Sequence, residues 1–574
     1  MKTILSFLKP YKLPIIIAYS LTLIELITDL LFPMFLGIMI NEGVLKNNPE
    51  NLILWGSIML GITIFTFACG IINSYFSSHV SISFAYDIRE KLFAKIQNFT
   101  FEKLSLYPTS TLVTRFTNDV RQIQNTIFMA LRIMVRAPLL VIGSIMMALI
   151  VNVKISLIFL IIVPLLIAFL YWVLIKGSTM FNKVQESVDY VNRVIQENIA
   201  GMRIIKAFVR RDFENVRFQD SNEKLAIETK DTFRFVEASM PILLFVMNIS
   251  LIFILWFGNK QTIAGTTNVG DVVAIVNYAL RTVMAISMFT FIALAFSRAK
   301  ASAERLEKIL TEESSSEASE ADSPKVEQGK IQFENVCFTY PGENVSVLEN
   351  ISFTLRPGER LAVIGATGSG KTTLFQLIPR LYEAQKGTIF IDDYPLSAYH
   401  IDELRNSIGY VPQSPLLFTG TIADNITFGK EDASQEEVIQ AAKDAQIHET
   451  IESFSEKYET IVGQRGVNLS GGQKQRISIA RALIRKPKIL MFDDSTSALD
   501  STTEAYLLEA LHKYDCSTLM ITQKISTAKK AERILLMDEG KMLAIGTHSE
   551  LLKTSKLYQK IVESQFEKEL PYVQ

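Results

Sequence analysis

The stretch Gly365–Thr372, with the sequence GATGSGKT, decides which fold the rest of the chain has to support. It follows the apolar run Leu361–Ile364, which is typical of a buried strand, and precedes Thr373–Ile378, whose pattern predicts a helix. Glycines let backbone N–H groups turn inward around phosphate oxygens, and a helix start adds partial positive charge there. Strand, glycine-rich turn and helix together predict a phosphate-binding loop.

Two further side chains predict what this loop binds. Lys371 can reach the β- and γ-phosphates of a nucleotide, and the Thr372 hydroxyl can ligate Mg²⁺. A second motif, Ile489–Asp493, is an apolar strand that ends in an acid, and it would place Asp493 beside the loop to hold the same ion. The motifs predict ATP and Mg²⁺ as cofactors.

A third motif predicts that the site is shared. Leu469–Gln473 is a Ser-Gly-Gly turn that leads into a basic helical stretch, so it offers a second helix start to a phosphate. One chain then holds two such ends but one complete phosphate-binding loop, which indicates a site built by two subunits. Tyr340 ends an alternating strand before the loop and could stack on an adenine ring, although a lone Tyr there would be a core residue.

Composition sets the broad class of the protein. The chain has 574 residues, of which 49% are hydrophobic and 20% charged, and its net charge of −1 argues against a nucleic-acid partner. Cys69, Cys337 and Cys516 lie far apart, so neither a disulfide framework nor a cysteine metal site is expected. Met1–Leu13 carries lysines but no cleavable signal pattern.

The apolar residues gather in the first half, in segments long enough to cross a bilayer. Lys2, Lys9 and Lys12 precede the first segment, which predicts a cytoplasmic N-terminus. We therefore expect a multi-pass protein of the cell membrane, with the lipid bilayer as a partner, and exclude a soluble ATPase. The predicted spans are Leu13–Ile40, Leu52–Phe76, Ile127–Val151, Ile155–Ile175, Pro241–Ile263 and Val272–Phe296.

Two segments between spans are long, charged and helical in pattern. Residues 77–126 and 176–237 would project tens of ångströms into the cytoplasm at about 1.5 Å per residue. Their tips, near 107–118 and 207–214, are expected to touch the nucleotide domain. The alternative is a pair of solvated helical hairpins.

Among the ionisable residues inside the predicted spans, five stand out. Glu25 and Asp29 are four apart and share a helix face, as do Arg132 and Arg136, and Arg281 lies in the last span. Charge inside a membrane is costly and tends to face a cavity or a partner. Two interpretations stay open: a polar translocation pathway, or acids that pair with arginines to hold the helices together.

These features divide the chain into three parts. Residues 1–310 are expected to form an all-α six-helix transmembrane domain with long cytoplasmic helical extensions. Residues 311–329 include a Ser/Glu-rich run without bulky apolar residues, which is typical of a flexible acidic linker. Residues 330–574 are expected to form an α/β P-loop NTPase domain.

The motif set resembles that of an ABC transporter, in the exporter-type half-transporter form of six spans fused to one nucleotide-binding domain. Gln413 matches the Q-loop, Ser497–Asp500 the D-loop and Tyr340 the A-loop aromatic residue. The resemblance implies that two nucleotide domains clasp two ATP molecules, each between one subunit's P-loop and the other's signature motif Leu469–Gln473. It also implies that the two tips are coupling helices, the second docking on the partner.

The motifs and the resemblance together assign residues to two roles. Those expected to bind ATP are Tyr340, Gly365, Ala366, Thr367, Gly368, Ser369, Gly370, Lys371, Thr372, Thr373, Gln413, Ser470, Gly471, Gly472 and Gln473. Those expected to hold Mg²⁺ are Thr372, Gln413 and Asp493.

Two departures from the family pattern bear on hydrolysis. Asp494 stands where the family has a Glu that positions the attacking water, and its carboxylate is retracted by about 1 Å, which can cost roughly 10²-fold in rate. Gln523 stands where the family has a switch His, and an amide cannot carry positive charge. Gln464, before the signature, replaces the usual Glu.

These departures favour a heterodimer over a homodimer with two slow sites. This chain would contribute a degenerate ATP site, and its signature would complete a hydrolytic site on a partner that carries the missing Glu and His. The expected activity is multidrug export of hydrophobic or amphiphilic compounds, with the Glu25 and Asp29 pair favouring cationic amphiphiles. A lipid or lipopeptide flippase and a non-pumping ATP-gated channel or regulator remain as alternatives.

Overall fold

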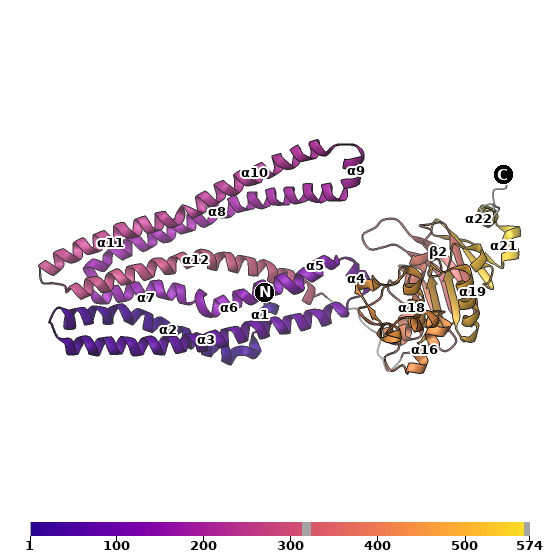
Figure 1. Ribbon diagram of the computed structural model, residues 1–574, viewed down its shortest axis with the longest axis horizontal. Coiled ribbons are helices and arrows are strands. Elements are labelled where there is room, and N and C mark those ends of the chain that lie inside the picture. Colours follow the sequence, from indigo (N-terminus) through magenta and orange to yellow (C-terminus); the bar gives the residue numbers. More distant parts are fainter. Residues whose placement is uncertain (1, 313–322, 567–574) are drawn as a thin grey trace. The chain divides into compact units, whose positions relative to one another are not determined.

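The computed structural model describes residues 2–312 and 323–566 (Figure 1). They form two compact units: Met1–Gln97 with Pro108–Glu312, and Asn98–Tyr107 with Glu313–Gln574. Most of the acidic linker predicted at 311–329 lies outside the described residues, because residues 313–322 are not among them.

The first unit is entirely helical. Six helical runs are long and apolar enough to cross a membrane: Lys9–Val44, Pro49–Gln97, Thr109–Val151, Val153–Ala200, Arg211–Ile263 and Val269–Leu310. Each contains one predicted span, so the predicted six-span helical fold is confirmed. The elements are α1 (Lys2–Ser6), α2 (Lys12–Ile38), α3 (Pro49–Gln97), α5 (Thr109–Thr114), α6 (Val120–Met129), α7 (Arg136–Val151), α8 (Val153–Ala200), α9 (Met202–Ala207), α10 (Arg211–Glu237), α11 (Ser239–Ile263) and α12 (Val269–Leu310).

Local sequence sets where several of these helices begin and bend. Asn152 separates α7 from α8, and its side-chain oxygen accepts a hydrogen bond from the Ile155 amide at 3.2 Å, which caps α8. Pro33 and Pro164 lie inside α2 and α8, which spanning helices tolerate because neighbouring groups satisfy the freed carbonyls. The apolar core of the unit is shared by α7, α8, α11 and α12.

Three π-helical segments, which the sequence did not predict, interrupt the helical runs. They are Met39–Val44, Arg115–Asp119 and Ala130–Met134. Such a segment adds one residue to a turn and rotates the side chains that follow it, and it is common near functional sites. The third segment contains Arg132 and directly precedes the turn that leads to Arg136.

The longest helices extend well past the thickness of a bilayer. The α8 helix has 48 residues, which corresponds to about 72 Å at 1.5 Å per residue. It runs beside α10 and α11, and the short helix α9 joins the two arms at one end, away from the other helices of this unit (Figure 1). The arms carry the second predicted tip, 207–214.

The second unit is an α/β domain built on two sheets. One is antiparallel, in the order β2-β1-β4-β5; the other has the order β12-β11-β3-β10-β9-β6 and is parallel except for β12. The strands are β1 (Ile331–Phe338), β2 (Leu348–Leu355), β3 (Arg360–Gly365), β4 (Lys386–Ile391), β5 (Tyr394–Pro395), β6 (Ile408–Val411), β9 (Ile489–Asp493), β10 (Ser517–Ile521), β11 (Arg533–Asp538) and β12 (Lys541–Gly546), with a separate pair β7 (Gly420–Thr421) and β8 (Ile461–Val462).

Helices complete this domain around two main apolar cores. One core joins the two sheets, and the other packs the helices between β6 and β9 against the parallel sheet. The helices are α13 (Lys371–Leu377), α14 (Ile401–Asn406), α15 (Ile422–Thr427), α16 (Gln435–Asp444), α17 (His448–Glu452), α18 (Gly471–Leu483), α19 (Ser501–Ala510), α20 (Ile525–Ala528), α21 (His548–Thr554) and α22 (Lys556–Phe566).

The short helix α4 (Phe101–Ser105) lies between two membrane helices in sequence but groups with the second unit. Thr100 caps α4, accepting a hydrogen bond from the Lys103 amide, and the Phe101 ring packs edge-on against Tyr382 at 5.5 Å between centroids. The segment in the second unit is therefore 98–107, N-terminal to most of the predicted tip 107–118, whose remainder forms α5 and a π-helical segment of the first unit. Its role as a coupling helix stays a prediction.

Candidate nucleotide-binding site

The phosphate-binding loop joins β3 to α13 and depends on two glycines. Gly368 and Gly370 have φ angles of 85° and 90°, in the left-handed region that side chains disfavour. A Cβ on Gly370 would lie 2.9 Å from the carbonyl oxygen of Val347. The loop can therefore take this path only with glycine at that position, as the motif requires.

Lys371 is buried, and its ammonium group lies inside the loop. It donates hydrogen bonds to the carbonyl oxygens of Gly365 at 2.9 Å and Ala366 at 2.6 Å. Burial lowers its pKa, and the nearby carboxylates of Asp493 and Asp494 oppose that shift. Phosphate oxygens can take the place of these carbonyl acceptors, which keeps the charge of Lys371 matched when a nucleotide binds.

Asp493 ends β9 and has the surroundings of a Mg²⁺ ligand. One carboxylate oxygen accepts from the Thr372 hydroxyl at 3.0 Å, and the other accepts from the Tyr410 hydroxyl at 3.2 Å. Burial raises the pKa of Asp493, and the bond from Thr372 opposes the shift. The side chains of Thr372 and Asp493 offer only oxygen atoms as metal ligands, which fits Mg²⁺. These two residues would hold the ion together with phosphate oxygens.

Tyr410 is a member of the site that sequence reasoning missed. It lies on β6, three residues before Gln413, and its hydroxyl fixes one oxygen of Asp493. Burial raises the pKa of Tyr410, so the phenol stays a hydrogen-bond donor at neutral pH. The sequence of β6, Ile-Gly-Tyr-Val, gave no signal for this role, which depends on the neighbouring strand β9 that ends in Asp493.

Asp494 and Gln523, the two departures from the family pattern, are in contact. The Gln523 amide donates to the Asp494 carboxylate at 3.1 Å, and Gln413 hydrogen-bonds the same carboxylate. Burial raises the pKa of Asp494, the bond from Gln523 opposes the shift, and the charge of Asp493 adds to it. The carboxylate is thus held by two amides at the edge of the phosphate cavity.

These residues line one cavity of about 250 Å³. Its walls are Val347, Thr367, Gly368, Gly370, Lys371, Thr372, Thr373, Gln413, Asp493, Asp494, Ile521 and Gln523. Most of the phosphate-loop residues that the sequence singled out, together with Gln413 and Asp493, therefore come together in one place, whereas Gly365, Ala366 and Ser369 do not line the cavity.

Tyr340 lies beside this cavity, against the start of α13. Its hydroxyl is hydrogen-bonded to Thr373 at 2.9 Å and donates to Gln376 at 3.1 Å. Its ring meets Tyr382 edge-on at 5.2 Å between centroids. Tyr382, which sequence reasoning did not select, thus touches both Tyr340 and Phe101 of α4.

The signature segment Leu469–Gln473 leads into α18, and reciprocal hydrogen bonds fix the start of this helix. Ser470 is the N-cap residue; its hydroxyl accepts from the Gln473 amide at 3.3 Å, and its own amide donates to the Gln473 side chain at 2.8 Å. A Cβ on Gly471 would meet no atom within 4 Å, so the turn is open on that side. Within the described chain, no residue of Leu469–Gln473 lines the phosphate cavity.

Four of the five charged span residues singled out from the sequence form one network. Arg136 binds Glu25 at 2.8 Å and also Asp29, and Arg281 lies 3.2 Å from Asp29. Arg132 is outside this network; it donates to the Ser74 hydroxyl at 3.4 Å. A second cavity, of about 390 Å³, borders the network and is lined by Glu25, Thr28, Asp29, Phe32, Ile62, Thr63, Thr66, Phe67, Gly70 and Arg281. The structure therefore contains both features that the sequence left open: ion pairs between the acids and the arginines, and a cavity beside them.

A buried acid outside the spans was also missed. Asp119, at the end of a π-helical segment, pairs with Arg115 at 2.8 Å and with Arg305 of α12, and accepts from Ser302 at 2.9 Å. This network ties the extension after α5 to the last helix of the unit. Arg115 and Asp119 are four residues apart, so helical spacing could have indicated their pairing, whereas Ser302 and Arg305 lie more than 180 positions from Asp119 and gave no such signal.

Comparisons with known proteins agree with this architecture. Residues 15–286 match the family described as ABC transporter transmembrane region, and residues 348–497 match the one described as ABC transporter. The chain is 50% identical, over 99% of both chains, to an uncharacterized ABC transporter ATP-binding protein, YfiB, of Bacillus subtilis.

Two further relatives have more specific names. The putative multidrug export ATP-binding/permease protein YgaD of Bacillus subtilis is 31% identical over 97% of this chain and 98% of its own. The ATP-dependent lipid A-core flippase of Syntrophus aciditrophicus is 31% identical over 87% and 84%. A solved bacterial Atm1-family ABC exporter with ATP bound superposes with a TM-score of 0.81 at 22% identity, covering 96% of this chain and 99% of that one, and shows the fold.

Proposed function

Since the chain belongs to the ABC transporter family, as an exporter-type half-transporter with six spans and one ATP-binding domain, we propose that it is the catalytically impaired subunit of a heterodimeric exporter. Such chains use ATP to export compounds across the membrane and act as dimers. The finer proposal concerns this chain's own ATP site, which would bind MgATP and hydrolyse it slowly.

One observation carries the proposal: the contact between Asp494 and Gln523. The groups that bind phosphate and Mg²⁺ are complete, from Lys371 to Asp493. At the position of attack, however, a short carboxylate is held by a neutral amide at 3.1 Å. The site lacks both the reach to align water on the γ-phosphate and a group that can become positively charged.

The intact signature supports a site shared between two subunits, and the departures at Asp494 and Gln523 favour a partner that differs from this chain. Leu469–Gln473 is capped and open, and in the described residues it does not line its own chain's cavity. It is therefore free to close a phosphate site on another subunit. That subunit would carry the Walker B Glu and the switch His, so one competent site and one degenerate site would form per dimer.

The tip of the second extension supports docking on the partner. Around α9, the side chains of Ile204, Phe208 and Val209 are 65%, 73% and 85% exposed. Val209 also has a φ of 53°, which is rare for a β-branched residue. An apolar tip of this kind fits a coupling helix that is covered only in the assembled dimer.

These parts give a transport cycle. ATP binding between the two domains favours their closed pairing by its differential affinity for the two states. Closure moves both coupling helices and tilts the spans, and hydrolysis at the partner's site reopens the pair. ATP that remains at this chain's site would keep the domains engaged between turns.

The proposed cargo is a hydrophobic or amphiphilic compound, and the proposed location is the cell membrane with the N-terminus in the cytoplasm. The multidrug export name of YgaD favours drugs, and the flippase relative keeps a lipid or lipopeptide as the alternative. The sequence favoured cationic cargo because of Glu25 and Asp29. Both acids are ion-paired with Arg136, which weakens that argument. A non-pumping channel or regulator is the remaining class.

Two measurements test this proposal. Purified chain alone in lipid nanodiscs should show little ATPase activity, whereas the chain co-expressed with its partner should hydrolyse ATP briskly at one site. Equal rates for the chain alone and the pair would refute the asymmetry. ATP-driven dye accumulation in inverted vesicles separates a pump from a channel, since a channel cannot accumulate dye against a gradient.

A further inference from the structure

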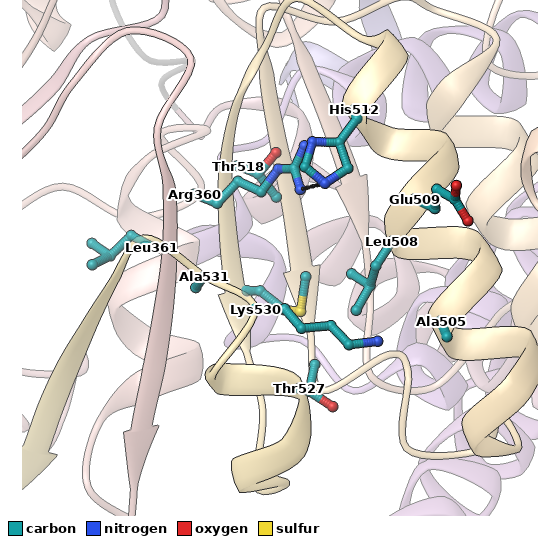
Figure 2. A pocket seen from close by; sticks show the side chains of 11 residues that line it. Arg360, Leu361, Ala505, Leu508, Glu509, His512, Thr518, Thr527, Lys530 and Ala531 are labelled. Carbon is teal, nitrogen blue, oxygen red and sulfur yellow. Dashed lines mark hydrogen bonds between the residues drawn. The ribbon is translucent and has the colours of Figure 1, made fainter. Parts of the chain in front are cut away.

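The second unit holds a cavity of about 470 Å³ that is separate from the phosphate cavity and shares no lining residue with it (Figure 2). Its walls are Arg360, Leu361, Ala505, Leu508, Glu509, His512, Thr518, Met520, Thr527, Lys530 and Ala531. None of these residues belongs to a motif for binding or hydrolysing ATP.

The cavity exists because two helices leave part of a sheet face uncovered. Parallel strands β3 and β10 pair Arg360 with Thr518 and Ala362 with Met520, so these side chains share one face. The α19 helix stands on one side of this face, and α20 with the turn to β11 stands on the other. Leu508 and Met520, both buried, make the inner wall apolar.

Cationic groups line the mouth. The guanidinium of Arg360 lies 2.8 Å from Nε2 of His512, and because a guanidinium can only donate, Nε2 is the acceptor in this contact. Within the described chain, neither Arg360 nor the exposed Lys530 has a carboxylate at ion-pair distance. The carboxylate of Glu509 points away from Arg360 and His512 (Figure 2).

This lining selects a class of ligand. Arg360 and Lys530 supply two positive charges without carboxylate partners, and a planar guanidinium suits the oxygens of a phosphate group. Leu508 and Met520 suit a small apolar body beside it. A phosphate monoester attached to an apolar group meets both requirements, whether it comes from a soluble metabolite or from the head of a lipid.

The cavity also borders the two segments that start at the ATP site. The α19 helix follows the D-loop, and α20 follows Gln523 after one residue. Inside the cavity wall, buried Glu504 of α19 accepts from the Thr527 hydroxyl at 2.8 Å and pairs with Lys524 at 3.2 Å. Lys524 is the neighbour of Gln523, whose amide holds Asp494.

We propose that this cavity binds a phosphate monoester with a small apolar body, and that a ligand between α19 and α20 alters how the Asp494–Gln523 site holds nucleotide. The mechanism is a shift in the spacing of the two helices that Glu504 links. The inference needs only ATP binding by this chain and is independent of whether the partner is a different subunit.

Binding is tested on the full chain in phosphatidylcholine nanodiscs by calorimetric titration with phenyl phosphate. The chain carries Lys371→Ala, so that the P-loop cannot contribute. We expect saturable binding that weakens at least about tenfold in Arg360→Gln/Lys530→Gln, because two charge-assisted contacts are lost. The control Lys513→Gln/Lys556→Gln removes the same charge elsewhere and should bind normally.

Absence of saturable binding, or an equal loss in the control, overturns the site. Dihexanoyl phosphatidic acid and phenyl phosphate distinguish the two sources: tighter binding of either one supports the shared phosphate chemistry and names its source. Phenol, which lacks the phosphate, should not bind; binding of phenol as tight as that of phenyl phosphate would contradict the assigned role of the cations.

Coupling is tested with the native P-loop by the affinity for a fluorescent ATP analogue. Saturating phenyl phosphate should change that affinity about threefold in the otherwise unaltered chain and not in Arg360→Gln/Lys530→Gln, which controls for competition at the P-loop. The same change in both chains would overturn the coupling. Loss of ATP binding without any phenyl phosphate would instead contradict the ATP site itself.

Discussion

Restoring reach and charge at the degenerate site should restore hydrolysis there. Asp494 is 8% exposed and its carboxylate lies 3.1 Å from the Gln523 amide, so its position is fixed. Asp494→Glu extends the side chain by one C–C bond, about 1.5 Å. Misplacement by about 1 Å can cost 10²-fold, so the gain in rate should be about 10²-fold, or about 2.7 kcal/mol in activation free energy.

Gln523→His supplies the second missing element, a ring that can take a positive charge near the γ-phosphate. The double variant Asp494→Glu/Gln523→His should therefore exceed Asp494→Glu alone. Asp494→Asn is the matched control, because it preserves the side-chain size and removes the carboxylate, and it should show no gain.

The assay is steady-state ATPase activity of the co-expressed pair at saturating MgATP, with the partner's own Walker B Glu replaced by Gln. Under that condition, only the site built on this chain's P-loop can contribute. A double variant that binds ATP normally yet hydrolyses it no faster than the unaltered chain would refute the reasoning, because reach and charge would then not limit the rate.

Three other results follow from contacts outside the phosphate cavity. Burial would raise the pKa of Glu359, but hydrogen bonds from Arg533 bring it below 4.5, so this pair stabilises the fold above that pH and the benefit is lost as pH falls. Glu359→Gln should thus cost about 2 kcal/mol near pH 7, and its melting temperature should converge with that of the unaltered chain in acid. Asp119→Asn leaves two arginines without their buried partner and should cost about 3 kcal/mol, measured as denaturant unfolding of the full chain; an unchanged midpoint would contradict the network. Phe101→Ala removes a ring contact with Tyr382 worth about 0.5–1.5 kcal/mol and should lower substrate-stimulated ATPase of the pair several-fold while basal activity persists; loss of both together would point to misfolding instead.

Local pattern was sufficient for much of the fold. Runs of about 20 apolar residues located all six spans, and the flanks of GATGSGKT located β3 and α13. Short motifs also brought Lys371, Thr372 and Asp493 to one cavity, because each sits at the end of a strand or the start of a helix in the same parallel sheet.

Features that depend on contacts between residues far apart in the chain could not be predicted from the sequence. The Asp119 network joins residues more than 180 positions apart, and Tyr410 gains its role from the neighbouring strand that ends in Asp493. The short helix α4, which Thr100 caps, was not predicted either. Pairing of acids with arginines in the spans was one of two interpretations of the sequence, and the packed helices show that Arg136 is the residue that pairs with Glu25.

This chain is proposed to bind ATP without hydrolysing it quickly, while its partner's site hydrolyses ATP. The most direct test photolabels the working pair with 8-azido-ATP carrying a radioactive α-phosphate, under turnover, and analyses the nucleotide on each chain. The account predicts mostly intact triphosphate on this chain and mostly diphosphate on the partner. Equal diphosphate on both chains, or brisk turnover by two copies of this chain, would contradict it.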